Sequence, residues 1–146
     1  MTFLTLYLDY LVFGVLGLMS FIMLSLVIER LLFYRQVNVN EYAHIELFQV
    51  ALTRNLTGIA SIASNAPYIG LLGTVLGILI TFNQMGTEGN MEARSIMVGL
   101  AMALKATAAG LLVAIPSTIF YNGLMRRSDT LIAAWKAEHE VSSQDN

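Results

Sequence analysis

Three long stretches of the chain carry almost no charged residues. They run from Tyr10 to Ile28, from Asn55 to Thr87 and from Ser95 to Met125, and Lys105 is the one charged side chain within them. A helix needs about 20 consecutive apolar residues to cross the hydrocarbon core of a bilayer. The pattern therefore predicts an all-α integral membrane protein with three membrane-spanning helices. We expect these spans at about residues 10–30, 60–82 and 96–122.

The segments between the spans contain helix caps and turn residues. Gly86, Gly89 and Asn90 in the second connection predict a short turn, so that the second and third spans form an antiparallel hairpin. In the first connection, Asn38 or Asn40 can cap a short amphipathic helix. Its apolar positions are Tyr42, Ile45, Phe48 and Leu52. We expect the tail from Val141 to Asn146, which is polar, to be disordered.

Lys and Arg residues outside the spans are distributed unevenly along the chain. None precedes the first span, and only one lies between the second and third. The residues are Arg30, Arg35 and Arg54 after the first span, Arg94 in the hairpin turn, and Arg126, Arg127 and Lys136 after the third span. Because positive residues stay on the cytoplasmic side, we predict an external N-terminus and a cytoplasmic C-terminus. Cytoplasmic segments are expected at about residues 31–58 and 123–146 of a single membrane domain, residues 1–146.

The overall composition agrees with a membrane protein and argues against several other classes. Hydrophobic residues make up 56% of the chain, charged residues 12%, and the mean hydropathy is +0.66. A net charge of −2 without a basic face argues against nucleic acid as a partner. The chain has no cysteine, only two widely separated histidines, and no phosphate-binding glycine loop. We therefore expect no enzymatic activity, no cofactor and no metal site.

Small residues line one face of each of the last two spans. On a helical wheel the small and polar residues of each span fall within an arc of about 100°. In the second span they are Ala66, Gly70, Gly73, Thr74, Gly77 and Thr81; in the third they are Gly99, Ala103, Ala106, Thr107, Gly110, Ala114 and Ser117. Glycine and alanine let helices approach closely, so their simplest role is helix packing. The hydroxyl groups of Thr74 and Thr107 either bond back to their own helix or face a polar lumen.

Lys105 is the one charged residue within the three otherwise uncharged stretches, and we expect it near the middle of the bilayer. A charge there costs several kcal/mol unless it is compensated. On the wheel Lys105 points about 150° away from the small-residue face. It then lies in a cavity with a partner's carboxylate, pairs with another subunit, or extends to the membrane surface; we favour pairing. Pro67 and Pro116 lie inside the second and third spans, where each removes a backbone hydrogen bond and can kink the helix.

Two sequence stretches resemble a known family. Residues 66–78, APYIGLLGTVLGI, are similar to the second-span signature of the ExbB/TolQ/MotA proton-channel family, and residues 103–116, ALKATAAGLLVAIP, followed by Tyr121 and Asn122, are similar to its third span. The resemblance implies a homo-oligomeric, pentameric ring in the bacterial inner membrane. It also implies two single-span partner helices of the ExbD type inside the ring, which carry a proton-accepting aspartate.

The resemblance also implies roles for particular residues. Thr74 and Thr107 correspond to the polar lumen threonines of the family. Family members commonly have a glutamate at the position of Met102, and this chain departs from them there. Lys105 lies about 60° from Met102 on the wheel. We hypothesise that Lys105 supplies the missing polar function, as a countercharge to the partner's aspartate.

Within the family, the three-span layout fits ExbB or TolQ better than flagellar stator subunits, which have four spans and a large cytoplasmic region. The resemblance thus implies an ExbB-like subunit that, with its ExbD-like partner, uses the proton gradient to energise TonB-dependent transport across the outer membrane. A TolQ-like role in maintaining the cell envelope is one alternative. A structural membrane oligomer that conducts no ions is another.

Overall fold

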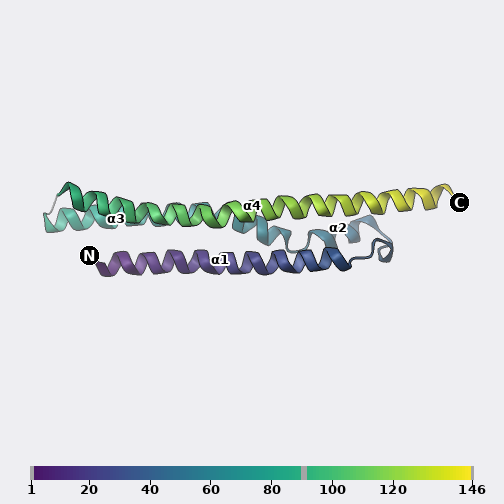
Figure 1. Ribbon diagram of the computed structural model, residues 1–146, viewed down its shortest axis with the longest axis horizontal. Helices are drawn as coiled ribbons and strands as arrows, with labels where there is room; N and C mark the ends of the chain where they lie inside the picture. The colour runs from purple at the N-terminus through teal and green to yellow at the C-terminus, as the bar shows by residue number, and fades with distance from the viewer. Residues whose placement is uncertain (1, 90–91, 146) are drawn as a thin grey trace.

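The computed structural model describes residues 2–89 and 92–145, which are almost entirely helical (Figure 1). The elements are α1 (Thr2–Gln36), the short 3₁₀-helix η1 (Val39–Glu41), α2 (Ile45–Thr53), α3 (Leu56–Glu88) and α4 (Ala93–Gln144). Among the described residues, α1, α3 and α4 are long and apolar enough to cross a membrane. The prediction of an all-helical protein with three potential membrane spans is confirmed.

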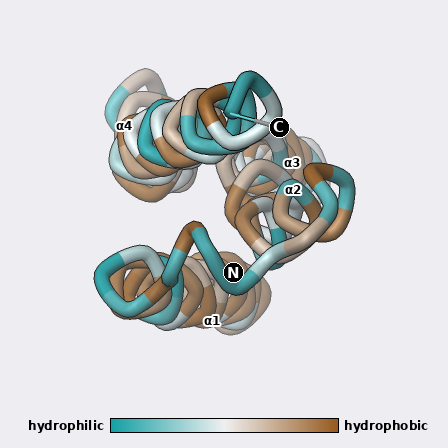
Figure 2. The backbone as a smooth tube through the Cα atoms, turned by 90° about the vertical axis from the view of Figure 1, so that its right-hand side faces the viewer, coloured by the Kyte–Doolittle hydropathy of each residue, from teal (hydrophilic) through white to brown (hydrophobic). Residues whose placement is uncertain are grey.

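The three long helices lie side by side. α3 and α4 run antiparallel and pack against each other more extensively than any other pair, while α1 runs parallel to α4 (Figure 1). Seen along the bundle, α1 and α4 lie on one side and α3 on the other, with α2 near α3 (Figure 2). The expected hairpin of the second and third spans is therefore the pair α3 and α4. We call the end of the bundle where α3 turns into α4 the distal end, and the end that holds α2 the proximal end.

Most of the apolar surface of the long helices faces outward. The structure buries 22% of the most apolar window of α1, 33% of that of α3 and 17% of that of α4. The tube of α1 is accordingly brown over much of its length (Figure 2). Water would not support exposed apolar surface of this extent. The helices therefore require lipid or further protein subunits around them.

The buried apolar residues form two clusters along the bundle. The proximal cluster joins α1, α2, α3 and α4 and contains Met23, Val27, Tyr34, Phe48, Leu52, Leu56, Ile59, Ile62 and Leu124. The distal cluster joins α1 to the hairpin and contains Leu8, Val12, Leu16, Ala66, Ala106 and Ala114. Large side chains thus fix the proximal end, whereas small ones allow close helix packing towards the distal end.

The short helix α2 forms where an amphipathic helix is expected, but its start differs from the prediction. Phe48 and Leu52 have no exposed surface. Asn38 caps η1 instead of α2, because its side chain accepts a hydrogen bond from the backbone N–H of Asn40 at 3.0 Å. His44 occupies the cap position of α2 without a side-chain hydrogen bond. The asparagine expected to cap α2 therefore caps the preceding 3₁₀-helix η1 instead.

The long helices extend further than the uncharged stretches indicate. α3 continues through Gly86 to Glu88 and ends at Gly89, whose φ of 72° is the left-handed conformation that glycine adopts readily. Asn90, the remaining residue of the expected turn, lies outside the described residues. α4 continues to Gln144, so the expected disordered tail is wrong for Val141 to Gln144.

Contacts with the first connection help to position the proximal part of α4. The indole N–H of Trp135 donates a hydrogen bond to the carbonyl oxygen of Tyr42 at 2.9 Å. His139 stacks on the Trp135 ring with 3.6 Å between the ring centroids. The proximal part of α4 therefore packs against the segment that precedes α2.

Candidate functional site

Gly70 and Gly110 bring the backbones of α3 and α4 into contact. A Cβ atom on Gly70 would lie 2.6 Å from the carbonyl oxygen of Ala106, and one on Gly110 would lie 2.6 Å from that of Ala66. Both clashes are with backbone, which cannot rotate away as a side chain can. We call this close contact between the two helices the α3–α4 seam. Its residues are Ala66, Gly70, Gly73, Gly77, Ala103, Ala106 and Gly110.

The other predicted packing residues lie along the same contact. A Cβ atom on Gly73 would meet Ala106 at 2.8 Å, and one on Gly77 would meet Ala103 at 3.1 Å. Gly99 lies against the side chain of Thr81, beyond the distal end of the seam. The two small-residue faces found on the helical wheels therefore face each other within one chain.

Thr74 and Thr107 meet at the edge of the seam. The Thr74 hydroxyl donates to the carbonyl oxygen of Ala103 on α4 at 2.9 Å, and the Thr107 hydroxyl lies in hydrogen-bonding contact with it. The carbonyl oxygen of Gly70, on the same helix as Thr74, lies 3.3 Å away. The contact with Gly70 is the bond back to the same helix that was one of the two expected arrangements, and the bonds between helices are additional to it.

The two threonines differ in how much surface they expose. Thr74 is 7% exposed in a single chain, whereas Thr107 is half-buried. Further subunits can only cover more of each side chain. Any contact of this pair with a lumen or a partner helix therefore falls mainly to Thr107.

Both predicted kink positions lie within continuous helices. Pro67 is an interior residue of α3 and Pro116 an interior residue of α4. Proline has no backbone N–H, so the carbonyl groups four residues earlier, at Ala63 and Leu112, lose their usual helical donor. The helices nevertheless continue past both positions.

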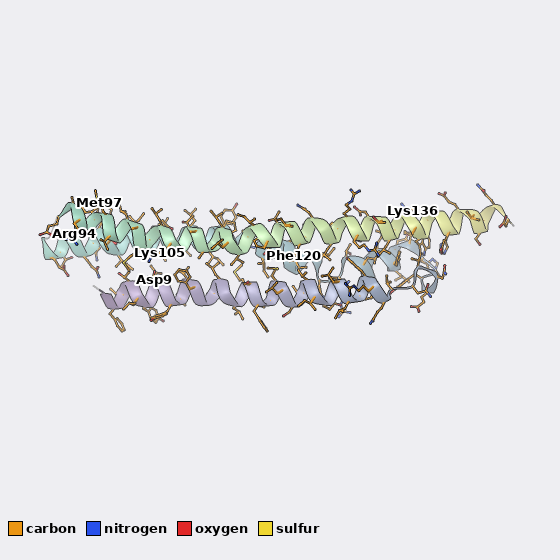
Figure 3. The ribbon with its side chains drawn as sticks, viewed as in Figure 1. Asp9, Arg94, Met97, Lys105, Phe120 and Lys136 are labelled. Carbon is orange, nitrogen blue, oxygen red and sulfur yellow. The ribbon has the colours of Figure 1, made fainter. Side chains whose placement is uncertain are left out.

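Lys105 is separate from the threonine pair. Its side chain is exposed and lies on the side of α4 that faces α1 (Figure 3). The level of Lys105 along the bundle follows from Gly73, where an added Cβ would lie 2.8 Å from Ala106 and 3.0 Å from Val12. Val12 and Ala106 are therefore level, and Lys105 lies beside the distal part of α1.

Lys105 lies far from the arginine pair along α4. Between Lys105 and the adjacent pair Arg126 and Arg127, the helix rises by about 30 Å. This distance is the full thickness of a hydrocarbon core. The expected depth of Lys105 near the middle of the membrane stays a prediction.

Sequence patterns identified Arg30 only as a marker of orientation, yet it is buried and connects two helices. Its side chain is 2% exposed and donates to the carbonyl oxygens of Ala51 at 2.6 Å and Leu52 at 3.3 Å, at the end of α2. It also forms two contacts with Glu29, at 2.5 and 2.6 Å. A guanidinium group at a helix C-terminus satisfies carbonyls that lack helical donors. The one sequence signal was an Arg directly after an apolar span.

The arrangement of helices and small residues agrees with a comparison of the sequence with protein families. The model of the MotA/TolQ/ExbB proton channel family matches residues 35–137. The chain belongs to this family. The match covers α2 and α3 and most of α4, and it leaves out almost all of α1, which carried no signature of its own. The resemblance drawn from the two hairpin stretches is thereby confirmed.

Individual relatives in the MotA/TolQ/ExbB family differ in how much of their length this chain covers. The biopolymer transport protein ExbB of Helicobacter pylori is 56% identical over 125 residues, which are 86% of each chain. ExbB of Aquifex aeolicus is 52% identical over 136 residues, or 92% of each chain. The Tol-Pal system protein TolQ of Pseudomonas aeruginosa is 40% identical over 84 residues, which cover 58% of this chain and 36% of TolQ. Similarity to these two ExbB proteins thus extends over nearly the whole chain, and similarity to TolQ over a part.

Proposed function

We propose that this protein is the ExbB-type subunit of a proton-driven motor in the bacterial inner membrane. In this proposal several copies, five by analogy with the family, form a ring around an ExbD-like partner whose single span carries an aspartate. Proton flow through the complex energises a TonB-like protein and thereby transport across the outer membrane. The chain itself performs no catalytic step.

The observation that carries this proposal is the extent of similarity to ExbB proteins. Two ExbB relatives match over 86% or more of both chains, whereas the match to TolQ covers 36% of that relative. ExbB of Neisseria gonorrhoeae, in contrast, is matched over 34% of its length, so the preference rests on the two ExbB relatives that are more than 50% identical. The ExbB-like role is therefore preferred over the TolQ-like one.

The exposed apolar surface supports assembly into a ring. Only 17% of the apolar window of α4 is buried within the single chain. Helices in lipid associate through small residues and interhelical hydrogen bonds. Arg126 and Arg127 on α4, together with Arg30 and Arg35 on α1, lie at the proximal end, and by the positive-inside rule this end is cytoplasmic.

Within the motor, we assign Thr107 to the proton path and Lys105, on a different face of α4, to a contact with the partner. Thr107 is the more exposed member of the threonine pair, and Lys105 is an exposed cation on α4. A cation beside the partner's aspartate would favour the ionised form of that carboxylate. Thr74 supports this surface from within the seam by holding the Thr107 hydroxyl.

Growth under iron limitation tests the proposal. A strain that lacks this gene should fail to grow when iron is supplied only as a siderophore complex, and should grow when soluble iron is plentiful. Wild-type protein should restore growth, Lys105→Met should not, and the matched control Leu104→Met, at the next residue of α4, should. Sensitivity to detergent at plentiful iron would favour the TolQ-like role instead. Full activity of both Lys105→Met and Thr107→Val would favour a structural oligomer.

A further inference from the structure

The groove between α1 and α4 is open at both ends. At the distal end, a cavity of about 470 Å³ is lined by Thr5 and Leu6 from α1 and by Val98 and Met102 from α4, among other residues. At the proximal end, a cavity of about 520 Å³ includes Leu31 from α1 and Phe120 from α4 in its lining. The two helices therefore do not close against each other along this side.

Asp9 lies on the α1 side of this groove and Lys105 on the α4 side. Both lie next to the distal cavity, on its proximal side. Asp9 follows Thr5 and Leu6 by about one helical turn, and Lys105 follows Met102 by three residues, so each continues the face that lines the cavity. In Figure 3 both side chains lie in the space between α1 and α4. Two residues on different helices thus border one groove with opposite charges.

The two residues also lie at the same depth. Val12 and Ala106 are level because a Cβ atom added to Gly73 would lie 2.8 Å from Ala106 and 3.0 Å from Val12. Asp9 precedes Val12 by three residues and Lys105 precedes Ala106 by one. At a rise of about 1.5 Å per residue in parallel helices, the two Cα atoms differ by about 3 Å along the bundle.

Both charges lack a partner in the single chain. Within the ranges that the structure describes, neither Asp9 nor Lys105 has a hydrogen bond or ion pair. Arg94, the other cation near the distal cavity, lies about 13 Å further along the bundle than Asp9, which exceeds the reach of its side chain. Lysine, in contrast, carries its ammonium group on a flexible four-carbon stem. Lys105 is therefore the cation best placed to meet Asp9.

We propose that Asp9 and Lys105 of the same chain form an ion pair across the groove between α1 and α4. The pair removes two isolated charges from the edge of the hydrocarbon, where each alone is unfavourable. It also ties α1 to the hairpin at the distal end, where the cavity leaves the helices apart. Asp9 lies outside the residues matched by the family model.

If the proposed function holds, Lys105 can pair either with Asp9 or with the partner's aspartate. This role of Lys105 rests on the proposed function. When the partner's aspartate is protonated and neutral, Lys105 pairs with Asp9. When that aspartate is ionised, the two carboxylates compete for Lys105. The proton on the partner thereby controls how firmly α1 is tied to α4.

Cross-linking tests the proximity of the two side chains. The natural sequence contains no cysteine, so Asp9→Cys combined with Lys105→Cys introduces a unique pair. A flexible bis-maleimide should join the two within one chain in native membranes, and the matched pair Asp9→Cys with Leu104→Cys, whose second cysteine points about 100° away around α4, should react far less. Equal reaction of both pairs, or joining of two chains into a dimer, would overturn the intrachain pair.

A set of charge variants tests whether the two residues interact. Asp9→Asn and Lys105→Met should each lower the unfolding midpoint in detergent, because each leaves one charge unpaired. The double variant should recover much of that loss, with a coupling on the order of tenfold in the unfolding equilibrium. The exchange of Asp9→Lys with Lys105→Asp should also be more stable than either single change. Additive losses would refute the pair.

These measurements do not depend on transport, so they separate the two proposals. Coupled stability in a protein that plays no part in iron uptake would leave the ion pair intact and overturn the proposed function. Additive stability in a protein that does support iron uptake would do the reverse. Competition by the partner predicts a further result: co-expression of the partner should reduce the yield of the Asp9–Lys105 cross-link, and an unchanged yield would contradict that step.

Discussion

Gly110→Ala is the sharpest single change for testing how the α3–α4 seam holds the hairpin together. The added methyl group would lie 2.6 Å from the carbonyl oxygen of Ala66 and 3.0 Å from the Cα atom of Gly70. Both atoms belong to the backbone of α3, so relief requires the two helices to separate. The separation would also stretch the bond from Thr74 to the carbonyl of Ala103.

The expected loss follows from two opposing effects. Overpacking a well-packed contact costs about 1–3 kcal/mol. Replacing glycine by alanine inside a helix returns about 0.5–1 kcal/mol through reduced chain entropy. The net destabilisation is therefore between zero and about 2.5 kcal/mol, or up to about 70-fold in the folding equilibrium.

A glycine elsewhere on α4 provides the matched control. A Cβ atom on Gly123 would meet nothing within 4 Å, so Gly123→Ala should be neutral or slightly stabilising. Detergent-induced unfolding can be followed through the fluorescence of Trp135, the only tryptophan of the chain. If Gly110→Ala proves as stable as Gly123→Ala, the two helices do not pack as closely as the seam requires.

Three further changes test other parts of the structure. Arg30→Met should destabilise the protein by about 1–3 kcal/mol, because the Ala51 carbonyl loses its side-chain donor while that of Leu52 keeps the Tyr34 hydroxyl; Arg35→Met, at an exposed site of the same helix, should have little effect in the same unfolding assay. Trp135→Phe should cost about 1 kcal/mol through the lost hydrogen bond to Tyr42 and should speed proteolysis between α1 and α2, whereas an unchanged cleavage rate would show that this bond does not hold the segment. Thr107→Val should lower stability by less than about 1 kcal/mol yet abolish iron-limited growth, and normal growth would remove Thr107 from the proton path.

Patterns along single helices and the antiparallel pairing of α3 with α4 were predictable from the sequence, whereas the level of side chains on neighbouring helices was not. The uncharged stretches predicted α1, α3 and α4, and the helical wheels predicted which faces of α3 and α4 carry small residues. A wheel, however, gives the direction of a side chain and not its level against a second helix. The contact of Thr74 with Thr107 depends on that level, so it became visible only once both helices were placed.

The same reason explains the missed role of Arg30. Arg30 is buried because the chain returns after the first connection and places the end of α2 beside it. The ends of the helices were not predictable from the charge pattern, because charged residues mark the edge of a membrane span and not the end of a helix. α4, for example, continues past Arg126 and Arg127 to Gln144.

The composition of the native complex tests the proposed function most directly. The tagged chain would be extracted from its own membranes in mild detergent, and the intact complex weighed by native mass spectrometry. We predict several copies of this chain, five by family analogy, together with fewer copies of a single-span protein that has an aspartate within its span. A single chain alone, or a ring that contains no second protein, would contradict the proposed function.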